Sequence, residues 1–196
     1  KERNFSLTKI GTTDKPIKIG DLIGNKFKIT IRNLSKGDFT GLEEKINQVR
    51  QTGFPNYFDS QRFRSVAGKK FIAKFVIKKE YEQAVKIYLT SYTRHDKSRV
   101  KQEKRSLLEH WGDFKKITLS SKTNTNILQI YNKTKNWLQT YTSIPRDMRE
   151  LFHASYQSFL WNECVKQILK QKVPKQIFPV SYAIGQLFFY KKRDEN

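Results

Sequence analysis

The sequence predicts an α+β fold from the order in which two hydrophobic patterns appear. Alternation of apolar and polar residues, which is typical of strands, falls in the first third of the chain. Apolar residues at helical spacing then dominate the remainder. A few strands followed by many helices is the order of an α+β domain. We expect one domain over residues 1–196 that is strand-rich at 1–65 and helix-rich at 66–171, with a tail at 172–196.

Strands are expected near the N-terminus, at residues 4–10 and 27–32. In the second segment Phe27, Ile29 and Ile31 alternate with polar residues, so one face is apolar and the other is basic. The basic residues of this segment are Lys26, Lys28 and Arg32. These residues predict a basic surface that contacts RNA.

Helices are expected from apolar stripes and from their start signals. Thr40 and Glu43 have the spacing of a capping box, and Leu42, Ile46 and Val49 form the stripe that follows. An irregular aromatic loop is predicted at residues 51–65. Further helical patterns cover residues 71–76, 81–89, 94–111 and 124–141, and another helix is expected to start near Pro145. A strand is expected at 187–190.

The charge balance points to a polyanionic partner. Lys and Arg total 39 and Asp and Glu total 18, which gives a net charge of +21. Phosphate contacts by such a surface give strong, salt-dependent binding of nucleic acid. A lysine-rich composition throughout the proteome is the alternative explanation of this excess.

The composition also excludes several classes of protein. One cysteine, Cys164, excludes an internal disulfide framework and a cysteine-based zinc site within one chain. No apolar run is long enough to span a bilayer. His95, His110 and His153 have no partner at metal-ligand spacing, and no phosphate-binding glycine loop is present. We therefore expect a cytoplasmic protein without a membrane segment or a metal site.

Residues 53–63 combine four aromatic side chains, two amides and an arginine in one predicted loop. An aromatic face stacks on a nucleobase that has left its helix, an amide reads the edge of the base, and arginine holds a phosphate. The alternative is a loop whose aromatic residues are anchored in the core. Residue chemistry alone leaves both interpretations of this loop open. We expect core positions for Trp137 and Trp161, and buried hydrogen-bonding roles for Gln157 and Asn162.

Three segments together resemble the pseudouridine synthase D family. Residues 56–63 resemble that family's N-Y-F-G-x-Q-R-F-G motif, and residues 20–27 resemble its G-x-L-x-G-N-x-F. Residues 154–162 resemble its helix with A-x-Q-S-x-L-F-N, preceded by residues 144–146. Each match is weak alone, but three in the family's order are specific.

The resemblance implies an antiparallel or mixed sheet of the pseudouridine synthase type flanked by helices. It also implies the isomerisation of a flipped-out uridine in RNA, in particular tRNA, without cofactor or metal. By match to the motif, Asn56 and Phe58 would line the base pocket, with Phe58 against the base. Gln61 and Arg62 would support the loop or contact the RNA backbone.

The sequence departs from the family pattern in two ways. The family's catalytic Asp lies in a G-x-K-D motif well upstream of the G-x-L-x-G-N segment, whereas the candidate here, Asp14, almost abuts Gly20. Within the aromatic motif, Asp59 and Arg64 replace glycines. We expect a partial catalytic domain that lacks the catalytic Asp motif. The alternatives are a non-catalytic RNA-binding module derived from the family and a basic protein-interaction domain without a role in RNA.

Overall fold

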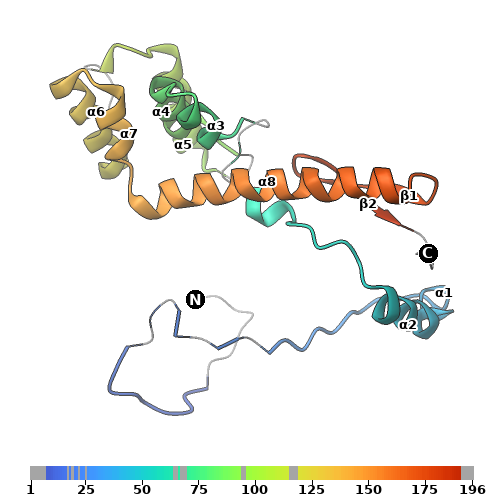
Figure 1. The fold of residues 1–196 in the computed structure, drawn as a ribbon. Helices are drawn as coiled ribbons and strands as arrows, with labels where there is room; N and C mark the ends of the chain where they lie inside the picture. Colours follow the sequence, from blue (N-terminus) through green and yellow to red (C-terminus); the bar gives the residue numbers. More distant parts are fainter. Residues whose placement is uncertain are drawn as a thin grey trace. The chain divides into compact units, whose positions relative to one another are not determined.

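The computed structural model describes residues 8–16, 18, 20–21, 23–24, 26–63, 66, 70–93, 96–114 and 119–190. The chain divides into two compact units, residues 1–47 and 48–196 (Figure 1). The first unit holds helix α1 (Lys36–Phe39) and the start of helix α2 (Leu42–Thr52), which ends in the second unit.

The predicted strand at residues 27–32 is wrong, because this segment has irregular structure. Phe27, Ile29 and Ile31 are 79%, 82% and 70% exposed. A strand is held by hydrogen bonds to a neighbouring strand, and no described residue of the first unit forms a strand that could pair with it. Residues 8–10 are likewise irregular and exposed, while residues 4–7 lie outside the described part of the chain. Alternation alone therefore did not produce a strand here.

The second unit contains a bundle of the five helices α3 to α7, which are labelled in Figure 1. Its core is formed by residues such as Val85, Leu89, Leu107, Ile127 and Ile144, which are all at most 1% exposed. Burying such aliphatic side chains is the main force that holds the bundle together. The helices are α3 (Ile72–Ile77), α4 (Tyr81–Thr90), α5 (Ser98–Glu109), α6 (Lys122–Thr134) and α7 (Trp137–Thr142).

The single helix predicted at residues 124–141 is two helices, α6 and α7. Lys135 ends α6 in a left-handed conformation with φ of 50°. Asn136 then caps α7, because its side-chain oxygen accepts a hydrogen bond from the Gln139 backbone N–H at 3.0 Å. The apolar stripe continues across the break, so periodicity alone did not reveal it.

Helix α8 (Arg146–Lys172) is the longest element among the described residues and starts directly after Pro145, as predicted. Phe152, near its start, is buried in the bundle core, and Met148 packs against that core. Beyond the bundle, α8 contacts β2 of a two-stranded hairpin (Figure 1).

The hairpin consists of β1 (Ile177–Tyr182) and β2 (Gly185–Tyr190), which pair antiparallel with Pro179 opposite Phe188. The predicted strand at 187–190 is confirmed within β2. Strand β1 was not predicted from the sequence, and its Pro179 lacks an N–H. Proline is tolerated in an edge strand where its nitrogen faces away from the partner.

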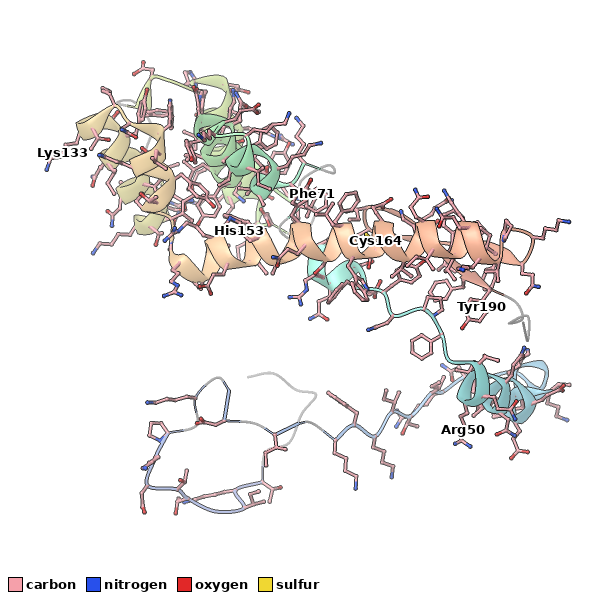
Figure 2. All side chains as sticks on the ribbon, in the orientation of Figure 1. Arg50, Phe71, Lys133, His153, Cys164 and Tyr190 are labelled. Carbon is pink, nitrogen blue, oxygen red and sulfur yellow. The ribbon has the colours of Figure 1, made fainter. Side chains whose placement is uncertain are left out.

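A second, smaller core joins α8 and the hairpin to the aromatic loop. Phe63, Phe71 and Ile184 are buried together, and partly buried side chains of α8 and β1 pack around them. The Phe71 ring lies 4.8 Å from the Phe159 ring, measured between centroids, and Figure 2 labels Phe71 beside α8. Phe63, the last residue of the motif at 56–63, is thus anchored in the core.

Candidate functional site

The aromatic loop follows α2, passes through residues 53–59 as irregular chain, and ends in a 3₁₀ turn, Ser60–Phe63. Gly53 starts it with φ of +71°, and its N–H donates to the Val49 carbonyl at 2.8 Å. A positive φ is available to glycine at little cost, so Gly53 ends the helix and turns the chain into the loop.

Asn162 of α8 holds the centre of this loop. Its side-chain oxygen accepts a hydrogen bond from the Phe58 N–H at 2.9 Å, and its side-chain nitrogen donates to the Phe58 carbonyl at 2.8 Å. Asn162 is fully buried. One amide therefore satisfies both backbone groups of one loop residue, although the two residues are 104 positions apart.

Two further residues of α8 hold the loop on either side of Phe58. The Trp161 indole N–H donates to the Asn56 carbonyl at 2.7 Å, and the Ser155 hydroxyl donates to the Arg62 carbonyl at 3.0 Å. The prediction that Trp161 is a core residue is wrong, since it is 49% exposed. Its indole nitrogen needs a partner when it is covered, and the loop carbonyl supplies one.

The hairpin supports the loop through tyrosine hydroxyls. The Tyr57 hydroxyl donates to the Phe188 carbonyl at 2.9 Å and accepts from the Phe188 N–H at 3.4 Å. Burial raises the pKa of Tyr57, which the hydrogen bond to Phe188 only partly offsets. The Tyr190 hydroxyl, labelled in Figure 2, donates to the Gly53 carbonyl at 3.2 Å. The loop is therefore held from two elements.

Phe58 and Arg62 stand out from this scaffold toward the surface. The Phe58 side chain is 36% exposed, and the Arg62 guanidinium lies 5.1 Å from the centre of its ring. Such a contact between a cation and an aromatic ring is attractive. It keeps a positive group beside an exposed aromatic face, which is a suitable surface for a nucleobase and its phosphate.

Next to this pair is an open pocket of about 400 Å³. Asp59, Gln61 and Arg62 supply polar groups to it, and Leu151 of α8 supplies an apolar wall. Asp59, which replaces a motif glycine, is not among the residues with positive φ, so this position does not require glycine. Arg64, the second replacement, lies outside the described residues.

The predicted site residues fall into two groups. Asn56, Phe58, Gln61 and Arg62 lie together on the anchored loop, and all four are exposed. Lys26, Lys28, Arg32 and Asp14 belong to the first unit, where they are exposed on irregular chain, so the three basic residues do not share a strand face.

The residues that hold the loop were only partly foreseen. Asn162 was expected to be a buried hydrogen-bonding group and is one, whereas Gln157 is exposed. Ser155 was not singled out. The one signal in the sequence was that Ser155, Trp161 and Asn162 fall in the third matching segment, residues 154–162, but nothing there showed that this segment binds the first.

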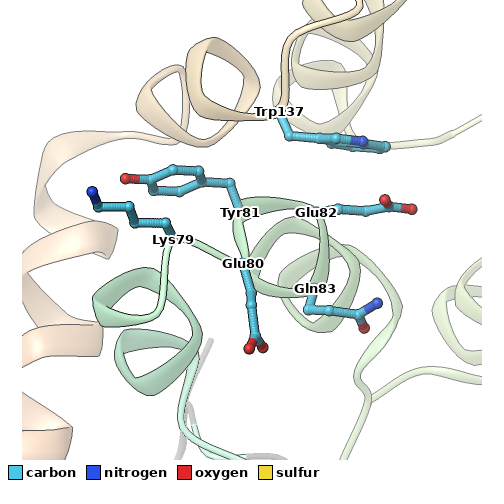
Figure 3. Close-up of a pocket in the computed structure, with 6 residues that line it drawn as sticks. All are labelled: Lys79, Glu80, Tyr81, Glu82, Gln83 and Trp137. Carbon is cyan, nitrogen blue, oxygen red and sulfur yellow. The ribbon is translucent and has the colours of Figure 1, made fainter.

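A second pocket, of about 310 Å³, lies at the start of α4 (Figure 3). Glu82, in its lining, accepts a hydrogen bond from the Trp111 indole at 2.9 Å. Trp137, also in the lining, stacks on Tyr131 with ring centroids 3.8 Å apart, as expected of a core residue. Two carboxylates, Glu80 and Glu82, disfavour a phosphate here. We do not assign nucleic-acid binding to this pocket.

Among the residues that the structure describes, no three His, Cys, Asp or Glu side chains form a group able to hold a metal ion. Across the same residues, no helix combines the length and the apolar character needed to cross a membrane.

The anchored loop and its aromatic and basic surface agree with the class of RNA-modifying enzymes that the motifs indicate. The sequence matches the family described as tRNA pseudouridine synthase D (TruD) over residues 1–181, and the chain belongs to this family.

Two relatives match nearly the whole chain. It is 42% identical to "Probable tRNA pseudouridine synthase D 2" of Methanocaldococcus jannaschii, over 99% of this chain and 47% of that protein. It is 38% identical to "Probable tRNA pseudouridine synthase D 1" of Methanococcus maripaludis, over 99% of this chain and 52% of that protein. The tRNA pseudouridine synthase D of Aquifex aeolicus is 30% identical over 81% of this chain and 41% of its own length. The chain thus spans about half the length of these relatives. No solved structure matches it significantly.

Proposed function

We propose that this chain contributes the base-binding loop of an RNA pseudouridine synthase that acts on tRNA and isomerises a flipped-out uridine. The observation that carries the proposal is the anchoring of the motif at 56–63 by the motif at 154–162. This contact leaves Phe58 exposed beside a guanidinium, at 36% exposure and 5.1 Å. A rigid aromatic surface with a nearby cation is suited to an unstacked nucleotide.

The exposed loop residues receive separate roles in this proposal. Phe58 stacks on the target base, and the Asn56 side chain reads the edge of that base. Gln61 and Arg62 bind the RNA backbone, since arginine matches phosphate geometry. Lys26, Lys28 and Arg32 add sequence-independent attraction to phosphates. The single cysteine agrees with a reducing cytoplasm as the place of action.

The reaction needs a carboxylate nucleophile, which the family supplies from its G-x-K-D motif. Asp14 is the candidate that this chain offers, and it is exposed on irregular chain. Its position almost next to Gly20 disfavours that role. We assign no catalytic residue, and no cofactor or metal enters the proposal.

The test is the release of tritium from tRNA that carries uridine labelled at carbon 5. Isomerisation joins this carbon to the sugar and frees the label, so release by the purified chain demonstrates the activity. Phe58→Ala and Arg62→Ala are expected to abolish it. Arg146→Ala is the matched control, because Arg146 is 85% exposed, pairs with Glu150 and lies outside the loop.

The second candidate is a non-catalytic RNA-binding module of the same family. The departure at the catalytic Asp motif favours it. This candidate predicts tRNA binding that depends on Phe58 and Arg62, with no tritium released by a folded chain. If the chain binds tRNA and other polyanions equally well, and if Phe58→Ala does not change this binding, both candidates are refuted.

A further inference from the structure

We propose that Asn162 is the positioning residue of the base-binding loop: its buried amide fixes where Phe58 presents its ring to RNA. This inference deepens the proposed function and rests on it. Asn162 itself does not touch the RNA, since it is fully buried in α8. It acts through the backbone of Phe58.

The geometry makes this contact specific. The amide of Asn162 carries an acceptor oxygen and a donor NH2 group in one plane. The oxygen accepts from the Phe58 N–H at 2.9 Å and the NH2 group donates to the Phe58 carbonyl at 2.8 Å. A buried amide without partners is costly, so loop conformations that leave Asn162 unsatisfied are disfavoured. The helix thus selects one backbone conformation at Phe58.

The other anchors act on different residues. Trp161 holds the Asn56 carbonyl, and Ser155 holds the Arg62 carbonyl. Asn162 holds Phe58 itself, the residue whose ring is exposed beside Arg62. Because a ring follows its own backbone closely, loss of the Asn162 contacts is expected to move the ring more than loss of either neighbouring anchor.

Asn162→Asp tests the proposal with little change in size. The substitution keeps an acceptor for the Phe58 N–H but replaces the donor with an oxygen that faces the Phe58 carbonyl. Ser158→Ala is the matched control on the same helix. Ser158 is also buried, at 4% exposure, but its hydroxyl donates to the Ala154 carbonyl and not to the loop.

The experiment is a double-mutant cycle on the full chain, with Asn162→Asp, Phe58→Ala and the double variant. The readout is anisotropy of a fluorescent, unmodified tRNA transcript at fixed salt, with circular dichroism to verify folding. We expect Asn162→Asp to weaken binding about fivefold when Phe58 is present and less than about twofold when it is Ala, which is the coupling of two residues acting as one unit. Ser158→Ala is expected to leave the affinity unchanged.

The possible failures are distinguishable. If Phe58→Ala does not weaken tRNA binding, the proposed function fails and the role of Asn162 fails with it. If Phe58→Ala weakens binding but Asn162→Asp weakens it equally in both backgrounds, or not at all, the proposed function stands and Asn162 is not a positioning residue.

A measurement on the unmutated chain covers the case in which Asn162→Asp does not fold. Hydrogen exchange of the Phe58 amide is expected to be slowed as in helix α8, because a buried oxygen accepts its hydrogen bond. Exchange as fast as that of an unprotected amide would overturn the proposal.

Discussion

The Tyr57 hydroxyl provides a sharp test of how the hairpin supports the loop. In a two-stranded ribbon, alternate residues direct their N–H and carbonyl groups away from the partner strand, where they need other partners. At Phe188 the Tyr57 hydroxyl supplies both, at 2.9 and 3.4 Å. Tyr57→Phe removes these hydrogen bonds. The edge-to-face contact of the ring with Phe189, at 5.5 Å between centroids, can remain.

The loss of stability expected for Tyr57→Phe follows from the lengths of its two hydrogen bonds to Phe188. A hydrogen bond contributes about 0.5–1.5 kcal/mol, and the bond at 3.4 Å is near the limit of useful geometry, so we expect Tyr57→Phe to lower the free energy of unfolding by about 1–2 kcal/mol. Tyr92→Phe is the control. The Tyr92 hydroxyl accepts from Arg105 at 3.2 Å on an exposed surface. Surface substitutions of this kind change stability by about 0.5 kcal/mol or less.

The assay is urea unfolding followed by tryptophan fluorescence, because all three tryptophans lie in the second unit. Burial raises the pKa of Tyr57 above its ordinary value of 10.0, so the folded chain keeps this proton when the unfolded chain loses it. The stability that the folded chain gains by keeping Tyr57 protonated is fully present below pH 10 and is lost as the pH rises further. Tyr57→Phe is therefore expected to reduce, but not remove, the alkaline loss of stability, since burial also raises the pKa of Tyr88, Tyr141 and Tyr182. Equal stability of wild type and Tyr57→Phe at neutral pH would refute the role of this hydroxyl.

Three further predictions concern single groups. Asp59→Gly is expected to lower the free energy of unfolding by about 0.5–1 kcal/mol in urea unfolding, because glycine adds backbone freedom at a position without positive φ. The same substitution is expected to raise the affinity for tRNA, measured by anisotropy, because it removes a negative charge. Asn136→Ala is expected to cost about 1 kcal/mol in urea unfolding through loss of the α7 cap, and an unchanged midpoint would contradict the cap. The hydrogen bond from Lys104 lowers the pKa of the Asp96 carboxyl. The stability that the ionised Asp96 adds to the fold is therefore present above the ordinary pKa of 3.8 and is lost as the pH falls below that value. Asp96→Asn is expected to reduce the loss of stability at acid pH by less than about 1 kcal/mol, because both side chains of the pair remain partly exposed to solvent, which screens their attraction. An unchanged loss of stability at acid pH would argue against this pairing.

The helices of the second unit were largely predictable, whereas of its strands only β2 was predicted, and only in part. Helical hydrogen bonds are local, so the stripe that starts after Pro145 was sufficient to predict α8. The break at Lys135 was missed because it depends on one left-handed residue and one cap, which leave the stripe almost unchanged. Strands depend on a distant partner, and for this reason the alternating segment at 27–32 has irregular structure while the proline-containing β1 pairs.

The sequence by itself determined the family, the basic character and the segment that carries Asn56, Phe58, Gln61 and Arg62, because these follow from residue identity and spacing. Only the tertiary structure decided which aromatic residues of that segment are anchors and which are surface. Phe63 is buried at 2% exposure, while Phe58, five residues earlier, is 36% exposed. The physical reason is that Asn162, Ser155 and Trp161 of α8 bind the loop backbone through hydrogen bonds across about a hundred residues of sequence. Such pairings exist only once the helix and the loop have been brought together by folding.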